Sequence, residues 1–485
     1  MAVVNSELEQ KPLYETIAVG SEIIFVVSNQ QAVQNETKVK FVARVHISDG
    51  TPPILSNNNA PTLIGTFKIS PNNAGVGMID ISNIVQNYVS PDNTAVNGSQ
   101  FKNAETTDEL THPIHMIDKY SKNKNIVRYL AIKFTVEYLN TTTNSIEEVD
   151  GTFVNSDLYR IFNGYLKRTD ALDRGGVFGN FTAPTKWFGY DFKKFYPETS
   201  TPGLFLTNAP TTQYANGGDY GTLAFFTISD TTSKSVRKIL IRTFDSSGSS
   251  LSTDTINRKP GAGSYGYTQW DTSTEKQIGY FGCFPGNLRN WGSNFRTIYN
   301  DPTQEISYYQ IITQNVSGAE TMETYTIYIN CPNTKGYESV RLCWLNQFGA
   351  WDYYTFTQKS VRKTTTKGTT YTQLAGTWNE ATYNPYGYKG GKKSFRMNAT
   401  ETITINTDFV SENDNVMFEE LTNSPEVYIL QPYQTTETGY EALNEYVTPV
   451  RLKSTSFTKK TIANDKLLQY TFEIEKSQTL RTQSI

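Results

Sequence analysis

The feature that most constrains this fold is a nearly strict alternation of apolar and polar residues in two segments. Between Val39 and Ile47 apolar residues occupy every second position, and the polar residues between them include His46. Residues 130–138 repeat the pattern, and the polar run 140–144 follows. Because successive strand side chains point to opposite faces, each segment predicts a half-buried β-strand, with His46 on the solvent face. The polar run predicts a hairpin turn.

The composition favours the same class of structure along the whole chain. Of 485 residues, 37% are hydrophobic, 13% are aromatic and 19% are charged. Disordered chains lack this many aromatic residues, and long solvated helices carry more charge. We therefore predict an all-β, multi-domain β-sandwich architecture with a few short helices. Further strands are predicted at 222–229, 236–244, 305–313, 322–330, 338–346, 351–357, 400–407, 447–457 and 467–475.

Two segments have the apolar spacing of a helix. The first is 80–89, where Asp80 or Ser82 could cap the N-terminus. The second is 411–422, where Ser411 and Asp414 have capping-box spacing. Residues 156–167 suit either a helix or a strand.

The length predicts about three domains, at roughly 150 residues for each. Linkers are expected at 198–219 and 246–265, where turn-forming residues gather, and a third boundary near 359–367, where a Thr/Lys-rich stretch begins. The predicted division is an N-terminal β-sandwich (1–150), a central β-rich region that could hold two sub-domains (151–360), and a C-terminal β domain with one helix at about 411–422 (361–485).

Charge and apolar runs exclude several classes of partner. The chain has 44 basic and 47 acidic residues, for a net charge of −3, so it lacks the basic surplus typical of nucleic-acid-binding proteins. The apolar run 23–27 is far shorter than the roughly 20 residues of a membrane-spanning helix, and the first 15 residues do not resemble a signal peptide. We expect no nucleic-acid partner, no membrane span and no signal peptide.

The three cysteines, Cys283, Cys331 and Cys343, are too few and too scattered for a disulfide framework. Synthesis in a reducing compartment is therefore expected. Cys343 lies within a predicted strand, and we interpret it as a small packing residue.

Three motifs superficially indicate phosphate or metal binding. Residues 387–394 resemble a Walker A loop but are one residue short and precede a predicted strand instead of a helix, so a basic hairpin loop is the better interpretation. Residues 261–266 match GxGxxG without a preceding strand, which favours a flexible loop. His112 and His115, with Asp118 nearby, could form a small ligand set, but Pro113 disfavours a helix, and we interpret them as loop histidines without a metal.

Paired carboxylates are the remaining catalytic option, because sequence spacing does not show which acids meet across strands. Glu419 and Glu420 are expected on the solvent face of a helix, and Glu473 and Glu475 on that of a strand. Asp108 and Glu109 complete the candidate acids. We predict no catalytic residues, no metal site and no cofactor, hence a protein that is not an enzyme.

Residues 338–357, ESVRLCWLNQFGAWDYYTFT, predict a hairpin of aromatic strands joined by a Gly-containing turn. This segment resembles an R-L-x-W-x-N-x-x-G-x-x-D-x-[FY]-x-F hairpin in virion structural proteins of marine or Bacteroidetes-infecting tailed bacteriophages. The resemblance is good over about 338–475, and residues 77–88 are similar to another recurring unit of these proteins. Its downstream motifs lie at 371–378, 387–393, 418–429, 450–457 and 464–474. These motifs are structural, so the resemblance implies a role in the particle and supplies no catalytic residues.

The resulting hypothesis is a tail or baseplate structural protein, assembled in the host cytoplasm, that holds other virion proteins in register as a homo-oligomeric ring or bundle. A basic region that begins at Lys359 and Arg362 is either a solvated hairpin pair or a surface that docks on an acidic neighbour. The candidate interface residues are Lys363, Lys367, Lys389, Lys392 and Lys393.

Two alternatives remain from other functional classes. One is a receptor- or glycan-binding tail protein, whose Tyr and Trp side chains would stack on a host surface glycan. The other is a polysaccharide depolymerase, which would need two converging acids in a groove.

Overall fold

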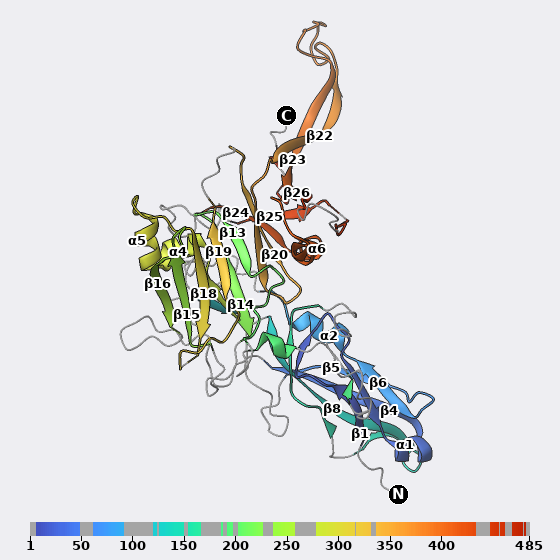
Figure 1. Cartoon of the computed structure of the whole chain (residues 1–485). Coiled ribbons are helices and arrows are strands. Elements are labelled where there is room, and N and C mark those ends of the chain that lie inside the picture. The colour runs from blue at the N-terminus through green and yellow to red at the C-terminus, as the bar shows by residue number, and fades with distance from the viewer. Residues whose placement is uncertain are drawn as a thin grey trace, which may run out of the picture.

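The computed structural model describes residues 6–48, 62–91, 120–123, 126–149, 154–165, 186–187, 192–196, 202–226, 236–257, 278–315, 317–330, 336–432, 447–454, 456–460, 468–478 and 480–481. These residues form five β-sheets and a few short helices (Figure 1). The predicted all-β, multi-sheet architecture is confirmed. Within the described ranges, no helix has the length and apolar character needed to cross a membrane.

The N-terminal unit surrounds one core with two sheets, ordered β12-β1-β3-β6 and β2-β11-β8-β4-β5, with β9 and β10 also on β8. Phe25, Phe41 and Phe134 lie in this core. The strands are β1 (Glu7–Pro12), β2 (Thr16–Ala18), β3 (Ile24–Ser28), β4 (Thr37–Ser48), β5 (Thr62–Ile69), β6 (Val76–Asp80), β8 (Val127–Asn140), β9 (Ser145–Glu148), β10 (Val154–Asn155), β11 (Tyr159–Phe162) and β12 (Lys186–Trp187), and the helices are α1 (Gln30–Asn35), α2 (Ser82–Val85) and η1 (Gln86–Tyr88).

The two alternating segments are the neighbouring antiparallel strands β4 and β8, and the polar run leads through a turn into β9, as predicted. The predicted helix at 80–89 is present as α2 and η1, and Asp80 Oδ1 accepts a hydrogen bond from the Ser82 backbone at 2.9 Å. The ambiguous segment 156–167 contains a strand, β11. The expectation that His46 faces solvent is wrong, because both faces of β4 are buried near its C-terminal end.

The middle unit contains a five-stranded sheet, β13-β19-β18-β15-β16, and a three-stranded sheet, β14-β17-β7. Its core is rich in buried aromatic rings, among them Phe205, Phe281 and Tyr309. The elements are β7 (Tyr120–Asn123), η3 (Phe192–Phe195), β13 (Thr212–Ala215), β14 (Thr222–Phe226), β15 (Lys238–Phe244), β16 (Ser250–Asn257), β17 (Ile278–Gly282), α4 (Pro285–Trp291), α5 (Ser293–Tyr299), β18 (Tyr308–Gln314) and β19 (Tyr325–Ile329). Both predicted linkers contain strands, since β13 lies in the first and β16 in the second.

The C-terminal unit is one eight-stranded sheet, β21-β20-β24-β25-β26-β23-β22, with β27 on β23. Strands from both sides of the boundary expected near residue 360 pair within it. The Ser411–Asp414 capping box is present and precedes α6, in agreement with the sequence. The elements are β20 (Val340–Leu345), β21 (Trp351–Phe356), β22 (Val361–Gln373), β23 (Gly391–Asn406), η4 (Glu412–Asp414), α6 (Asn415–Asn423), β24 (Val427–Leu430), β25 (Val447–Leu452), β26 (Thr471–Lys476) and β27 (Leu480–Arg481).

The β20–β21 hairpin is shared by two hydrophobic cores. Cys343 and Tyr353 belong to the core of the middle unit, whereas Leu342, Trp344 and Phe356 belong to the core of the C-terminal sheet. Strand alternation explains this division, because neighbouring residues of one strand face opposite sides. The hairpin is therefore a common wall of two units, and the interpretation of Cys343 as a buried packing residue is confirmed.

The turn of this hairpin also contacts the N-terminal unit. The Tyr165 backbone N–H donates to the Gln347 carbonyl at 2.9 Å. Gly349 has a φ of +71°, and a Cβ there would overlap the Asn163 carbonyl oxygen. Glycine is required at this position both for its backbone conformation and because the turn and the segment at Asn163 approach each other so closely.

Truncation of Trp344 tests the shared wall. Trp344 is fully buried, so Trp344→Ala should lower the free energy of unfolding by about 3–5 kcal/mol, as measured by chemical denaturation. The matched control is Trp378→Ala, because Trp378 is 66% exposed and its loss should change stability by less than about 0.5 kcal/mol. Equal effects of the two substitutions would contradict this description of the core.

Candidate functional site

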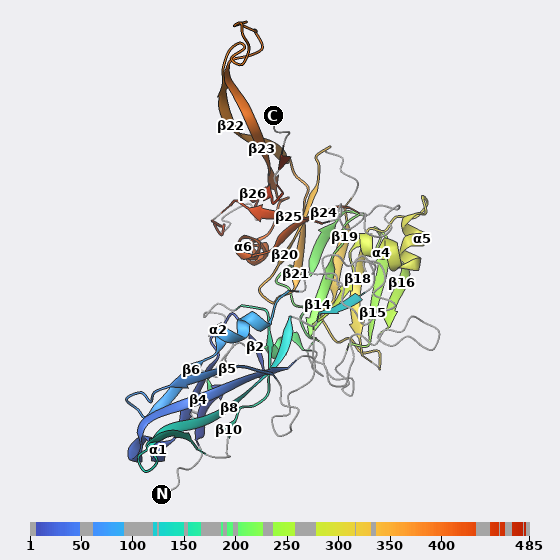
Figure 2. The same cartoon turned by 180° about the vertical axis from the view of Figure 1, so that it is seen from behind.

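The most distinctive surface feature is a hairpin that projects from the C-terminal sheet (Figures 1 and 2). We call residues 361–397 the arm and residues 374–390 its tip. Strand β23 pairs with β26 only over Thr402–Asn406 and with β27 only over Asn398–Ala399. Beyond these points, β22 and β23 pair only with each other among the described residues. The outer arm is thus a two-stranded ribbon with no underlying sheet or helix.

The base of the arm is held by charged side chains. The Arg362 guanidinium pairs with Glu338 and, at 2.8 Å, with Glu401, and Lys476 pairs with Glu401 at 2.8 Å. The hydrogen bond from Lys476 is the main reason that the pKa of Glu401 lies below its ordinary value, and Arg362 contributes in the same direction. These contacts fix the point at which the ribbon leaves the body.

Little apolar burial supports the outer arm. Residues 361–370 of β22 are all exposed, and a ring contact between Tyr371 and Phe395, 6.4 Å between centroids, lies on the ribbon. Its many Thr residues favour a strand because they are β-branched. An isolated two-stranded hairpin is only marginally stable in water. A ribbon of this length with so much exposed backbone is typical of an element that acts in contact with something else.

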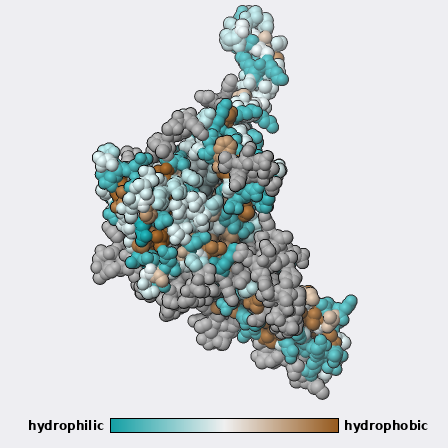
Figure 3. Space-filling view, viewed as in Figure 1, coloured by the Kyte–Doolittle hydropathy of each residue, from teal (hydrophilic) through white to brown (hydrophobic). Residues whose placement is uncertain are grey.

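The tip displays large aromatic side chains to solvent. Trp378, Tyr383, Tyr386 and Tyr388 are between 40% and 70% exposed. Trp378 and Tyr383 meet edge to face, and Tyr386 and Tyr388 stack at 5.5 Å. The ammonium group of Lys389 lies 5.2 Å from the centre of the Tyr386 ring. The tip is pale in Figure 3, because Tyr and Trp have near-neutral hydropathy.

Hydrogen bonds within the tip hold these rings in place. Thr377 Oγ1 donates to the Thr382 carbonyl at 2.7 Å and accepts from the Asn384 backbone at 2.9 Å. The Trp378 indole donates to the Ala375 carbonyl at 2.6 Å. The rings are therefore presented in a fixed arrangement, and clustered exposed aromatic residues are characteristic of interaction surfaces.

All five candidate interface lysines lie on the arm, but not in one patch. Lys363 and Lys367 face Thr402 and Asn398 along the ribbon, and Lys393 and Lys392 face Tyr371 and Thr372 near the tip. Tyr371 lies eight residues after Lys363, which corresponds to about 26 Å of strand. Adjacent Lys392 and Lys393 point to opposite faces because they are strand neighbours. Lys389 lies in the tip itself.

Sequence reasoning missed the four tip rings, although residues 371–378 and 387–393 were singled out as motifs. The signal that could have found them is a cluster of Trp and Tyr between two Thr/Lys-rich strand segments. The rejection of a Walker A loop at 387–394 is confirmed, because strand β23 begins at Gly391 and no helix follows the loop. His112, His115 and Asp118, residues 261–266, Asp108, Glu109 and Cys331 lie outside the described residues. The described part of the chain contains no group of three or more His, Cys, Asp or Glu that could hold a metal ion.

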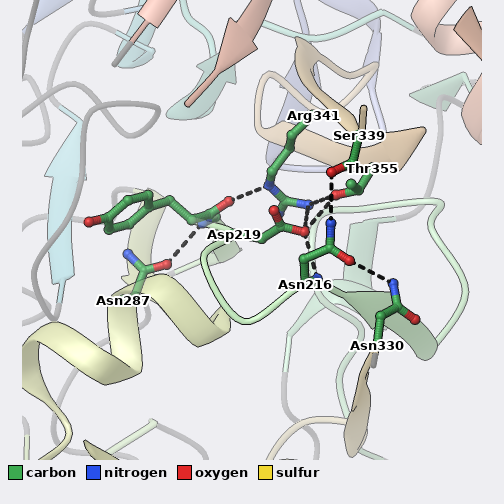
Figure 4. Close-up of polar contacts among 9 residues, drawn as sticks. Asn216, Asp219, Asn287, Asn330, Ser339, Arg341 and Thr355 are labelled. Carbon is green, nitrogen blue, oxygen red and sulfur yellow. Dashed lines mark hydrogen bonds and ion pairs between the residues drawn. The ribbon is translucent and has the colours of Figure 1, made fainter. Parts of the chain in front are cut away.

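A buried polar network joins the β20–β21 hairpin to the middle unit (Figure 4). The Arg341 guanidinium lies 3.4 Å from the Asp219 carboxylate, and both side chains are buried. Arg341 also donates to the Tyr220 carbonyl at 2.7 Å and to Thr355 Oγ1 at 2.8 Å, and Thr355 Oγ1 donates to Asp219 at 2.7 Å. Arg341 of the β20–β21 hairpin is thus a structural cation with a buried counter-ion.

The same network anchors the loop that carries Asp219. The Asn216 backbone donates to the Asp219 carboxylate at 2.8 Å, and the Gly286 backbone at the start of α4 donates to the Asp219 carbonyl at 2.7 Å. The Asn287 side chain accepts from the Gly221 backbone at 2.9 Å. Residues 216–221 are therefore held from α4 on one side and from β20 on the other.

The remaining polar residues of the motif reach the segment that precedes this loop. The Asn346 amide donates to the Leu206 carbonyl at 2.9 Å, and its oxygen accepts from the turn backbone at Phe348 and Ala350. The Asp352 carboxylate accepts from Thr207 Oγ1 at 2.6 Å. The polar residues of the motif thus fasten the hairpin to the middle unit.

Asp352 also meets Glu420 from α6, which corrects the expectation that Glu420 faces solvent. Both side chains are 3% exposed, because segment 207–209 covers this end of α6, and Asn208 donates to Glu420 Oε1 at 2.6 Å. Burial raises the pKa of Asp352 to about 6, against hydrogen bonds with Thr207, Asn346 and Glu420 that lower it. Two ionised carboxylates can only accept hydrogen bonds, so a proton shared between Asp352 and Glu420 lets one carboxyl donate to the other. Neither carboxyl lines an open groove.

Of the other described acids, the two on β26 lie on a partly exposed face, and Glu419 is more buried than the sequence predicts. Glu473 and Glu475 lie on the outer face of β26, where both pair with Lys453. Glu419 is partly exposed and pairs with Lys459 at 2.8 Å.

Comparisons with known proteins add little to this description. No protein-family model and no curated protein matches the chain. One similar solved structure is the native conformation of E. coli alpha-2-macroglobulin, determined by cryo-EM. It is 8% identical in sequence with a TM-score of 0.17, and the match covers 83% of this chain and 22% of the macroglobulin chain. The chain spans less than a quarter of that protein's length, and so low a TM-score does not establish a shared fold.

Substitution of Arg341 tests the junction. Arg341→Met removes one partner of a buried ion pair and leaves the Asp219 charge uncompensated, so the free energy of unfolding should fall by about 3–5 kcal/mol. Adding Asp219→Asn to this variant should recover part of the loss, because it removes the stranded charge. Denaturant unfolding of the single and double variants measures both effects, and a further loss in the double variant would contradict the proposed pairing.

The Asp352 carboxyl predicts a pH dependence of stability. Its pKa in the folded state, about 6, lies above the ordinary value of 3.8, so the folded state binds the proton more tightly. The resulting stabilisation is complete below pH 3.8 and is lost as the pH rises through about 6. The Asp352→Asn variant lacks this titrating carboxyl and does not lose the stabilisation. Its free energy of unfolding relative to the wild type should therefore rise by about 1 kcal/mol between pH 5 and pH 7.5.

The measurement is the midpoint of denaturant unfolding at the two pH values. Glu473→Gln is the control, since Glu473 is an exposed carboxylate that lies outside the buried pair, and its stability relative to the wild type should change little. If the free energy of unfolding of Asp352→Asn differs from that of the wild type by the same amount at both pH values, the shared-proton description is refuted.

Proposed function

We propose that this chain is a structural component of a tailed-phage virion, in the tail or baseplate, acting through protein–protein interfaces in a homo-oligomeric ring or bundle. The observation that carries the proposal is the arm. It projects an ordered set of four exposed aromatic rings on a ribbon that has little apolar support of its own. Such an element gains its stability from the surface against which it packs.

The resemblance over about 338–475 supports the same function. That region contains the β20–β21 hairpin, the arm, α6 and strands β24–β26. In this region the motif polar residues fasten the sheet to the middle unit, and the arm extends from the fastened sheet. A rigid body with a projecting contact element suits a subunit that holds other virion proteins in register, assembled in the host cytoplasm.

A second candidate function is binding of a host surface glycan by the tip. The observation that favours it is the stacked pair Tyr386 and Tyr388 beside the exposed Trp378, since aromatic faces with polar edges can stack on sugar rings. The depolymerase alternative needs two carboxyls in an open groove, and the buried Asp352–Glu420 pair does not provide them.

Removal of the tip in a phage that encodes this chain tests the proposal. Gln373 and Gly391 are the last paired residues of the ribbon, so residues 374–390 can be replaced by a two-residue Asn-Gly turn without altering the strands. We expect the wild-type chain among the proteins of purified virions by mass spectrometry. The shortened chain should give particles with missing or defective tails by electron microscopy.

The control is Tyr214→Ser, which removes an exposed aromatic ring from β13, far from the arm in sequence, and should leave particles intact. Absence of the chain from purified virions would exclude a structural role. Intact particles that no longer adsorb to the host, with wild-type particles binding to a glycan array, would favour the glycan-binding candidate instead.

A further inference from the structure

The charge of the chain is divided unevenly between the arm and the rest. Residues 361–397 contain seven Lys or Arg and one Glu, a net charge of +6. The whole chain has a net charge of −3, so the remaining residues, which we call the body, carry −9. A basic arm thus projects from an acidic body, and opposite charges on two surfaces steer them together and exclude partners of like charge.

We propose that the arm of one copy docks on the acidic body of a second copy. This inference rests on the proposed function, because it names the partner of the same arm. Exposed carboxylates of the body include Glu22, Glu305 and Glu320. In this proposal Lys367, Lys389 and Lys392 supply the positive charge of the arm, and the tip rings supply the apolar contact.

The outer edge of β22 gives the contact a second component. Along Val361–Gln373 this strand pairs only with β23 among the described residues, so its other edge offers backbone N–H and C=O groups. An unpaired edge can accept a strand from another chain. Charged residues on such an edge oppose indiscriminate pairing, and here Lys363 and Lys367 favour an acidic partner over another copy of the arm.

The available area fits this two-part contact. A fully enclosed aromatic side chain buries about 150–250 Å², so four partly exposed tip rings offer on the order of 400 Å². A stable interface needs about 800 Å² from each partner. The tip alone is therefore too small, and the ribbon face and edge must supply the rest.

The position of the arm determines the type of assembly. The arm and the N-terminal unit lie at opposite ends of the molecule in both views (Figures 1 and 2). A contact between different surfaces of two copies is heterologous, and it closes into a ring when the rotation between copies allows. This geometry is compatible with the ring or bundle proposed above.

The first test measures the mass of the full-length protein by light scattering after size exclusion, from 1 to 100 µM and at low and high salt. We expect the wild type to assemble at low salt and to dissociate as salt increases. Lys389→Glu/Lys392→Glu should raise the protein concentration needed for half-maximal assembly at least tenfold. Trp378→Ser/Tyr388→Ser should weaken assembly similarly but keep the salt dependence of the wild type, because it removes apolar contact and no charge.

The matched control is Lys40→Glu/Arg451→Glu, which makes the same change in net charge with two exposed body residues. It should assemble as the wild type does, and thermal unfolding verifies that every variant is folded. A wild type that is monomeric at 100 µM and low salt overturns the proposal. Assembly that is as strong in both arm variants as in the wild type also overturns it.

The second test locates the contact with a carbodiimide, which joins Lys directly to a contacting Asp or Glu. In assemblies of mixed ¹⁴N- and ¹⁵N-labelled copies, we expect mixed-isotope cross-links from arm lysines to body carboxylates. If the virion contains the chain but its arm lysines cross-link only to other proteins, the docking proposal fails and the structural function stands. If copies dock through the arm but virions lack the chain, the structural function fails and the docking stands.

Discussion

The structure depends on the β20–β21 hairpin, whose two faces belong to two different cores. Each strand is buried on both sides, with Trp344 among the residues of the C-terminal core and Tyr353 in that of the middle unit. Apolar packing alone permits small shifts of one unit on another, whereas buried ion pairs and hydrogen bonds require one geometry. Arg341, Asn346 and Asp352 supply those directional contacts to segment 206–221.

The arm inherits its orientation from this junction. Only residues 357–360 separate β21 from β22, and Arg362 is bound to Glu338, which lies two residues before the start of β20. The middle unit therefore helps to define where the arm points, although the two share no strand. The polar residues of the 338–357 segment have a physical role in this account, since Arg341, Asn346 and Asp352 each make a contact that a different side chain would lose, and Gly349 permits a turn that a Cβ would block.

Local sequence signals predicted the local features well. Alternation placed β4 and β8, the polar run placed the turn before β9, and the capping box placed the start of the last helix, because each depends on residues close in sequence. Burial of His46 and Glu420 was not predictable in this way. A polar residue on an apparently wet face becomes buried when another segment covers it, as residues 207–209 cover Glu420, and the covering segment is distant in sequence.

The boundary near residue 360 and the arm show a second limit of sequence reasoning. A Thr/Lys-rich stretch is compatible with both a linker and an exposed strand, because both are solvated. Only the pairing of β22 with β23 distinguishes them. The five candidate interface lysines all lie on the arm, whereas the tip rings were overlooked because no strand or helix periodicity organises them.

The turn at Gly349 has a mechanical consequence. It touches the N-terminal unit at Asn163 and Tyr165, and the Tyr280 hydroxyl of the middle unit donates to its carbonyl at 3.2 Å. This one bend therefore couples the three units, since a displacement of it would disturb contacts with the N-terminal unit, the middle unit and the C-terminal sheet at the same time.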